Sequence, residues 1–331
     1  MAPSAEDAAG VYLRSYMAPL AEFLERDDVT DIYVNRPGEL WVEAVGGGIE
    51  QHSVPALDTV VLDRLSHQVA ALAHQGISRE HPLLSATLPG GARIQIIAPP
   101  ATRGPLALAI RKHISADLSL LDYAAAGAFE RTRHAPALDP IDQSLADLFA
   151  KGDMPGLLAL AVRSRKNILI SGGTSTGKTT FLNALIREIP AEERLILIED
   201  TPELHLRHPN AVGLLAARSA LGEARVSADD LLGASLRMRP DRIILGELRG
   251  EEAYAFLRAV NTGHPGSMTT VHADSAERAV EQIALLVLQT GTRLTRDDVV
   301  HYVRSTVDVF VQLARSGGRR HVAEVVLRRP A

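Results

Sequence analysis

The sequence contains no cysteine and few aromatic residues. Among its 331 residues there is one Trp, and Phe, Trp and Tyr together make up 4%. The absence of cysteine excludes both a disulfide framework and a thiolate zinc site. A protein that tracks single-stranded nucleic acid needs a basic, aromatic-lined path, whereas this chain carries a net charge of -5. The composition therefore gives no strong direct nucleic-acid signal.

Long apolar runs and a signal peptide are also missing from the sequence. No stretch of about 18 uncharged apolar residues occurs, and the N-terminal MAPSAEDAAG lacks the basic-then-apolar order of a secretory signal. We therefore expect a cytoplasmic protein. Hydrophobic residues make up 46% of the chain, which is enough for a buried core in each of two domains.

Residues 1–112 predict a small α+β domain. Apolar residues at helical spacing predict one helix that ends near ERDD and a second over residues 57–74. Alternating runs separated by Pro- and Gly-containing turns predict the strands DIYVN, ELWVE, LLSATL, RIQIIA and LALAIRK. The polar, proline-containing segment 113–140 is typical of an interdomain linker, and residues 141–331 form the second predicted domain.

The second predicted domain contains the pattern of a phosphate-binding loop. The strand NILIS, the loop GGTSTGKTT and the helix FLNALIREI follow one another, and residues 172–179 complete the order G-x-x-x-x-G-K-T. Glycines let backbone N–H groups surround phosphates, and the start of the helix adds its positive dipole end. Lys178 is predicted to contact the β- and γ-phosphates of ATP, and Thr179 to ligate Mg²⁺. The predicted nucleotide-binding residues are Gly172, Gly173, Thr174, Ser175, Thr176, Gly177, Lys178, Thr179 and Thr180.

Two strand ends carry candidate catalytic carboxylates. The run RLILIED ends in Glu199 and Asp200, and RIILGE ends in Gly246 and Glu247. In parallel α/β sheets, ligands bind beyond the carboxyl ends of the strands. Many P-loop enzymes carry an Asp where Gly246 stands, so we expect metal contacts from Thr179 and water, with Glu199 as a further candidate. Glu247 is predicted to orient or polarise the attacking water, and the alternative for both glutamates is a routine solvated strand end.

The stretch NTGHPGSMTTVHADS adds a histidine to the same edge of the predicted sheet. The run GSMTTVHA is typical of a strand, and its end brings His272 close to the phosphate loop. A histidine there can donate a hydrogen bond to a γ-phosphate oxygen. His264 precedes the strand, at its opposite end, and a core position is the alternative for both histidines. Their spacing matches no usual zinc pattern, so no zinc site is expected.

The order of these motifs resembles a known superfamily. The stretches GGTSTGKTT, LIEDTPEL, RMRPDRIILGELRG and NTGHPGSMTTVHADS are similar to the phosphate loop, Asp box, Gly-Glu Walker B motif and His box of the secretion NTPases. Within that superfamily the chain resembles the VirB-type traffic ATPases of bacterial type IV secretion systems over nearly its whole length. The stretches NRPGELWVE, GGARIQIIAPP and ALAIRKH fit the N-terminal domain of that family.

The resemblance implies a fold, an activity and an assembly. The expected fold is α/β, with a RecA-like P-loop C-terminal domain and a smaller α+β N-terminal domain. The expected activity is Mg-dependent ATP hydrolysis by a homo-hexameric ring motor that powers substrate translocation or pilus assembly. Members of the family work peripherally at the inner face of the cytoplasmic membrane, so the implied partners are inner-membrane components of a secretion apparatus.

The resemblance also implies roles for several arginines. Two N-terminal arginines of the family reach over the bound phosphates, and the matching positions here are Arg93 and Arg111. An arginine in that place offsets charge that develops on the transferred phosphoryl group. Three further arginines flank the Gly-Glu strand and act either across a subunit boundary or in surface salt bridges. They are Arg237, Arg239 and Arg249.

Two other classes of function share the phosphate loop. A nucleic-acid-translocating RecA-like motor is one alternative, although the low aromatic content and acidic charge argue against it. A nucleotide-gated assembly switch, in which slow hydrolysis only resets partner contacts, is the other.

Overall fold

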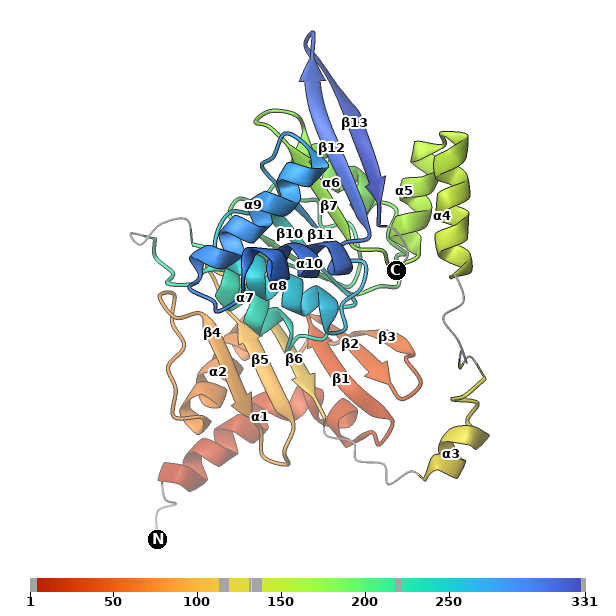
Figure 1. Cartoon of the computed structure of the whole chain (residues 1–331). Helices are drawn as coiled ribbons and strands as arrows, with labels where there is room; N and C mark the ends of the chain where they lie inside the picture. Colours follow the sequence, from red (N-terminus) through yellow and green to blue (C-terminus); the bar gives the residue numbers. More distant parts are fainter. Residues whose placement is uncertain (1–4, 113–118, 131, 133–138, 218–221, 329–331) are drawn as a thin grey trace.

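The computed structural model describes residues 5–112, 119–130, 132, 139–217 and 222–328. Within these ranges the chain forms a six-stranded sheet from the N-terminal part and a seven-stranded sheet from the C-terminal part. The two sheets lie in separate domains that pack directly on each other (Figure 1). Much of the predicted linker, residues 113–118, 131 and 133–138, falls outside the described ranges.

The N-terminal domain is an antiparallel sheet covered on one face by two helices. The strand order is β3-β2-β1-β6-β5-β4, and every neighbouring pair is antiparallel. Apolar side chains of the two helices, among them Leu20 and Leu65, share one buried cluster with the sheet. The elements are α1 (Ala5–Glu25), β1 (Val29–Val34), β2 (Glu39–Ala44), β3 (Ile49–Ser53), α2 (Thr59–Leu72), β4 (Leu83–Thr87), β5 (Arg93–Ile97) and β6 (Ala107–Arg111).

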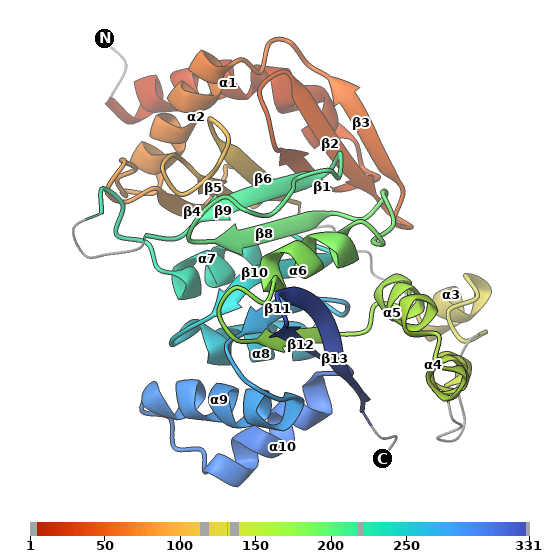
Figure 2. The ribbon, with the colours of Figure 1, turned by 90° about the horizontal axis from the view of Figure 1, so that it is seen from above.

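The C-terminal domain is a mostly parallel sheet with helices on both faces (Figure 2). Its strand order is β13-β12-β7-β11-β10-β8-β9, in which only β13 runs antiparallel to its neighbour. The short helix α3 (Leu120–Ala125) lies between the domains in sequence and buries none of its side chains. The strands are β7 (Ile168–Gly172), β8 (Leu195–Glu199), β9 (Ala211–Leu215), β10 (Arg242–Leu248), β11 (Met268–Val271), β12 (Val309–Ser316) and β13 (Arg319–Leu327). The helices are α4 (Pro140–Lys151), α5 (Met154–Arg163), α6 (Lys178–Ile186), α7 (Ala228–Ser235), α8 (Glu252–Asn261), α9 (Ala276–Gln289) and α10 (Arg296–Thr306).

A fully buried arginine joins the two domains. The guanidinium carbon of Arg194, just before β8, lies 4.0 Å from the ring centroid of Tyr33 on β1. The same group donates to Asn35 Oδ1 at 2.8 Å and to the carbonyl of Met238 at 3.0 Å. Burial lowers the pKa of Arg194 to about 10, so the side chain is still charged at neutral pH. Because a buried charge is costly without partners, these contacts fix the N-terminal sheet on the C-terminal domain.

A loop of the N-terminal domain also extends the C-terminal sheet. The segment between β5 and β6 forms an antiparallel bridge between Thr102 and Leu214 on β9. The amide of Leu215 donates to the carbonyl of Ala101, and the amide of Arg103 donates to the carbonyl of Gly213, both at 2.9 Å. This pairing covers the β9 edge and directs the Arg103 side chain toward the carboxyl end of β8.

Candidate nucleotide-binding site

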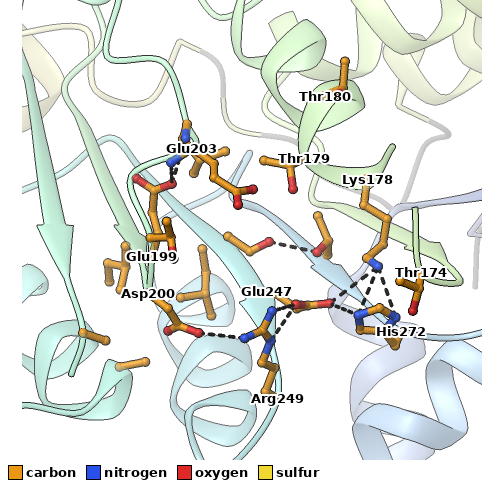
Figure 3. Close-up of a pocket in the computed structure, with 18 of the residues that line it drawn as sticks. Thr174, Lys178, Thr179, Thr180, Glu199, Asp200, Glu203, Glu247, Arg249 and His272 are labelled. Atoms are coloured by element: carbon orange, nitrogen blue, oxygen red, sulfur yellow. Dashed lines mark hydrogen bonds and ion pairs between the residues drawn. The ribbon is translucent and has the colours of Figure 1, made fainter. Parts of the chain in front are cut away.

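A cavity of about 640 Å³ opens at the carboxyl ends of the parallel strands. Residues 173–180 of the phosphate loop line it, together with the ends of β8, β10 and β11 (Figure 3). Gly172 is not among the lining residues, but its carbonyl accepts a hydrogen bond from Lys178 Nζ at 3.1 Å. The loop segment predicted from the sequence therefore forms one side of this cavity.

The phosphate loop has a conformation that requires glycine at two positions. A Cβ on Gly172 would lie 2.5 Å from Thr176 Oγ1 and 3.1 Å from the carbonyl of Leu313, so a larger residue would collide with the neighbouring strand. Gly177 has φ +94° and stands at the N-terminal cap of α6. Positive φ is strained for residues with a Cβ, whereas glycine adopts it freely. The local sequence thus shapes the loop that leads into the start of α6.

A charged cluster lies beside the loop, and Glu247 at the end of β10 is its centre (Figure 3). Glu247 Oε1 lies 2.9 Å from His272 Nε2 and 3.6 Å from Lys178 Nζ. Arg249 Nε donates to Glu247 Oε2 at 2.6 Å, and its Nη1 reaches Asp200 Oδ2 at 2.9 Å. Burial lowers the pKa of Lys178, and the nearby Glu247 opposes that shift. The cluster brings together the Walker A lysine, the Gly-Glu acid and the second histidine of the His box.

Glu199 lines the same cavity, but both oxygens of its carboxylate already have partners within the protein. Its Oε2 accepts the backbone amides of Glu203 at 2.8 Å and Leu204 at 2.7 Å. Its Oε1 forms an ion pair with the Arg103 guanidinium, which also donates to the Leu204 carbonyl at 2.7 Å. Glu199 therefore holds the turn after β8 and links it to the N-terminal domain.

Most of the other predicted arginines lie away from the cavity. Arg93 and Arg111 are exposed and face each other as register partners on β5 and β6, and neither lines the cavity. Arg237 donates to the carbonyl of Gly233 at 2.9 Å. Arg239 reaches Glu43 of the N-terminal domain at 3.4 Å. Of the three arginines that flank β10, only Arg249 lines the cavity.

His264 occupies a position separate from His272. It precedes β11, and its Nδ1 lies 3.1 Å from the carbonyl oxygen of Ala259 at the end of α8. Burial lowers the pKa of His264, which favours a neutral ring that donates to that carbonyl. The contact supports a structural role in the turn that leads into β11.

The donors at the loop suit a hydrated divalent cation. Thr179 lines the cavity at the first turn of α6 and points into it (Figure 3). Within the ranges that the structure describes, no group of three or more His, Asp or Glu side chains is arranged to hold a metal. Mg²⁺ keeps several waters and needs only one or two protein ligands beside substrate phosphates, so a single hydroxyl fits it.

Two arginines at the cavity were not predicted from the sequence: one pairs with Glu199 and the other lines the cavity. Arg103 comes from the β5–β6 loop, and Arg320 comes from the β12–β13 hairpin and lines the cavity. Both are distant from the motifs in sequence, and no local pattern marks them.

Among the described residues, no helix has both the length and the apolar character needed to cross a bilayer.

The strand, loop and helix at the parallel edge, with the acidic residues at the carboxyl ends of β8 and β10, define a RecA-like P-loop nucleotide-binding protein. Residues 141–325 match the family model described as Type II/IV secretion system protein. The chain belongs to this family. The prediction of the family and that of the fold class are both confirmed.

Similarity to individual relatives covers nearly the whole chain. It is 41% identical over 324 residues to the type IV secretion system protein VirB11 of Bartonella henselae, which covers 93% of this chain and 91% of that protein. It is 39% identical over 325 residues to the type IV secretion system protein PtlH of Bordetella pertussis, covering 94% and 93%. The crystal structure of the VirB11 ATPase from the Brucella suis type IV secretion system in complex with sulphate matches with a TM-score of 0.90. That match has 39% sequence identity and covers 97% of this chain and 95% of the other.

Proposed function

We propose that this chain is an ATPase that powers type IV secretion. The observation that carries the proposal is the convergence of Lys178, Glu247 and His272 on one cavity at the phosphate loop. Relatives similar over nearly the whole chain are type IV secretion proteins, and one of them is described as an ATPase. The enzyme class follows from the site, and the coupling to secretion follows from the relatives.

In this proposal Glu247 activates the attacking water. Lys178 and His272 both contact its Oε1, and both are groups that a γ-phosphate attracts. When these two side chains turn toward phosphate oxygens, Glu247 loses two of its partners and accepts a hydrogen bond from water instead. Substrate binding and activation of the carboxylate are thereby coupled.

The proposed metal is Mg²⁺, held by the Thr179 hydroxyl. A divalent cation in this place would neutralise charge on the β- and γ-phosphates. Glu199 has both carboxylate oxygens engaged by amides and by Arg103, so we propose that it acts on the metal shell through water. Backbone N–H groups of residues 173–180 hold the phosphates themselves.

We also propose that the protein works as a homo-hexameric ring in which sites are completed between subunits. Arg93 and Arg111 do not line the cavity of their own chain, and they form an exposed cationic pair on adjacent strands. In a ring, this pair would face the cavity of a neighbouring subunit and stabilise the phosphoryl group there.

The proposed location of the protein is the cytoplasmic face of the inner membrane, where it would dock on membrane components of the secretion apparatus. The proposed domain boundaries are 1–112, 113–140 and 141–331.

Mixed assemblies test both the chemistry and the sharing of sites. Lys178→Ala and Arg111→Ala subunits are each expected to hydrolyse little ATP alone. If Arg111 acts on a neighbour's cavity, mixing the two proteins restores part of the activity, because some cavities combine an intact loop with an intact arginine. No recovery on mixing would contradict sharing between subunits, and full activity of Lys178→Ala alone would contradict the proposed chemistry.

A further inference from the structure

The β12–β13 hairpin carries positive charge beside the phosphate loop. Strand β12 runs parallel to β7, and Leu313 is the register partner of Gly172, where the loop begins. The hairpin continues past this edge, turns at residues 317–318 and returns through Arg319. Figure 1 shows it extending well beyond the rest of the sheet.

One hairpin side chain lies against the loop itself. A Cβ built on Gly177 would be 3.2 Å from Arg320 Cδ, 3.7 Å from Nη1 and 3.8 Å from Nε. Arg320 therefore lies over the glycine that caps α6, and it lines the nucleotide cavity. The guanidinium is thus beside the backbone N–H groups that would bind phosphates.

The residues that line the cavity include more acids than lysines and arginines. The acidic lining residues are Glu199, Asp200, Glu203, Glu247 and Glu252. The lysine and arginines that line it are Lys178, Arg249 and Arg320, and His272 lines it as well. Lys178 and Arg249 both have carboxylate partners. Arg320 has no ion pair or hydrogen bond with any other side chain that the structure describes. It is free to neutralise an anion in a cavity whose own acids outnumber its bases.

The hairpin also places like charges opposite each other. Arg315 on β12 is the direct register partner of Arg320 on β13. Like charges directly opposite across a pair of strands repel each other, and a bound anion relieves that repulsion. The arrangement therefore favours an anionic ligand at the loop side of the hairpin.

We propose that Arg320 is a nucleotide-binding residue that contacts the phosphate chain from the hairpin side of the loop. This inference rests on the proposed function, since it assigns a further contact in the same ATP site. The ligand is the phosphate chain that ATP and ADP share, and the contact is made within one chain. A guanidinium also suits the fork geometry of phosphate oxygens.

Binding of ADP, measured by titration calorimetry at low and at moderate salt, tests the assignment. Arg320→Ala is expected to weaken ADP binding by about tenfold or more, the usual effect of losing a charge-assisted contact. Arg320→Lys keeps the charge and is expected to recover much of that loss. Arg319→Ala is the matched control, because adjacent strand residues point to opposite faces and Arg319 does not line the cavity.

The outcomes separate this inference from the function on which it rests. Equal ADP affinity of the unchanged protein and Arg320→Ala would overturn the role of Arg320 alone. A loss in Arg320→Ala that Arg320→Lys does not recover would overturn the assignment to phosphate charge. Failure of the unchanged protein to bind ADP would overturn the proposed function itself.

Discussion

Arg103 of the N-terminal domain forms an ion pair with Glu199 at the edge of the nucleotide cavity. The two side chains are 16% and 5% exposed, so little solvent screens their attraction. Glu199 also binds the backbone amides of the turn after β8. One carboxylate therefore connects the position of the N-terminal domain to the shape of the site.

Removing the Arg103 side chain is expected to destabilise the folded chain. Arg103→Ala leaves the buried Glu199 without its cationic partner, and breaking such a pair costs about 3 kcal/mol. A urea titration followed by circular dichroism should show the first unfolding transition at a lower concentration. The double variant Arg103→Met with Glu199→Gln removes both charges and should recover part of the loss. An unchanged midpoint in Arg103→Ala would contradict the importance of the pair.

Glu247→Gln is expected to separate ATP binding from hydrolysis. The amide cannot take a proton from water, so the rate should fall by about 10²-fold or more, the usual effect of losing a general base. Nucleotide affinity should persist because Lys178 and the loop backbone are intact. Steady-state hydrolysis and equilibrium ATP binding measure the two effects. A variant that hydrolyses no ATP but still supports secretion would instead favour the nucleotide-gated assembly switch.

The stability of the protein should decrease in mildly acidic solution because of His264. Burial lowers the pKa of this histidine below its ordinary value of 6.5, so the folded chain resists a proton that the unfolded chain accepts. The stabilising contribution of the neutral ring is therefore present above pH 6.5 and is lost as the pH falls toward the lowered pKa. His264→Gln should show a smaller loss of thermal stability over that range. An identical pH dependence in both proteins would contradict this role.

Arg194→Lys should weaken the junction between the domains even though the charge is kept. Lysine lacks the planar fork that donates to Asn35 and to the Met238 carbonyl and that stacks on Tyr33. Leaving buried acceptors unpaired costs about 1–3 kcal/mol each. Thermal unfolding measures the loss. The matched control is Arg163→Lys, whose side chain is 64% exposed in a surface ion pair and should change stability little.

Local sequence patterns predicted the elements that carry the nucleotide site. The glycine-rich loop, the acids at the ends of β8 and β10, and His272 after β11 each stand where a predicted strand ends. Parallel strands bring those ends to one edge of the sheet. Strand β3 and strand β9 were missed, because IEQHS is mainly polar and AVGLL is interrupted by glycine.

Tertiary contacts explain what the sequence did not reveal. Arg103 reaches Glu199 because the β5–β6 loop pairs with the edge of β9, and Arg320 reaches Gly177 because the last hairpin lies beside β7. Neither arginine lies in a local sequence motif that would indicate its contact. Conversely, the resemblance to the family assigned phosphate contacts to Arg93 and Arg111, but both lie outside the cavity of their own chain.

We propose a ring ATPase whose sites are completed by assembly, so its activity should depend on the oligomer. Mg²⁺-dependent ATP hydrolysis should be measured as a function of protein concentration, with the mass in the same samples determined by light scattering and with Lys178→Ala as control. Activity should rise with a hexamer-sized species and be lost in the variant. Full activity in a monomer would leave the phosphate chemistry intact but contradict the ring and its shared sites.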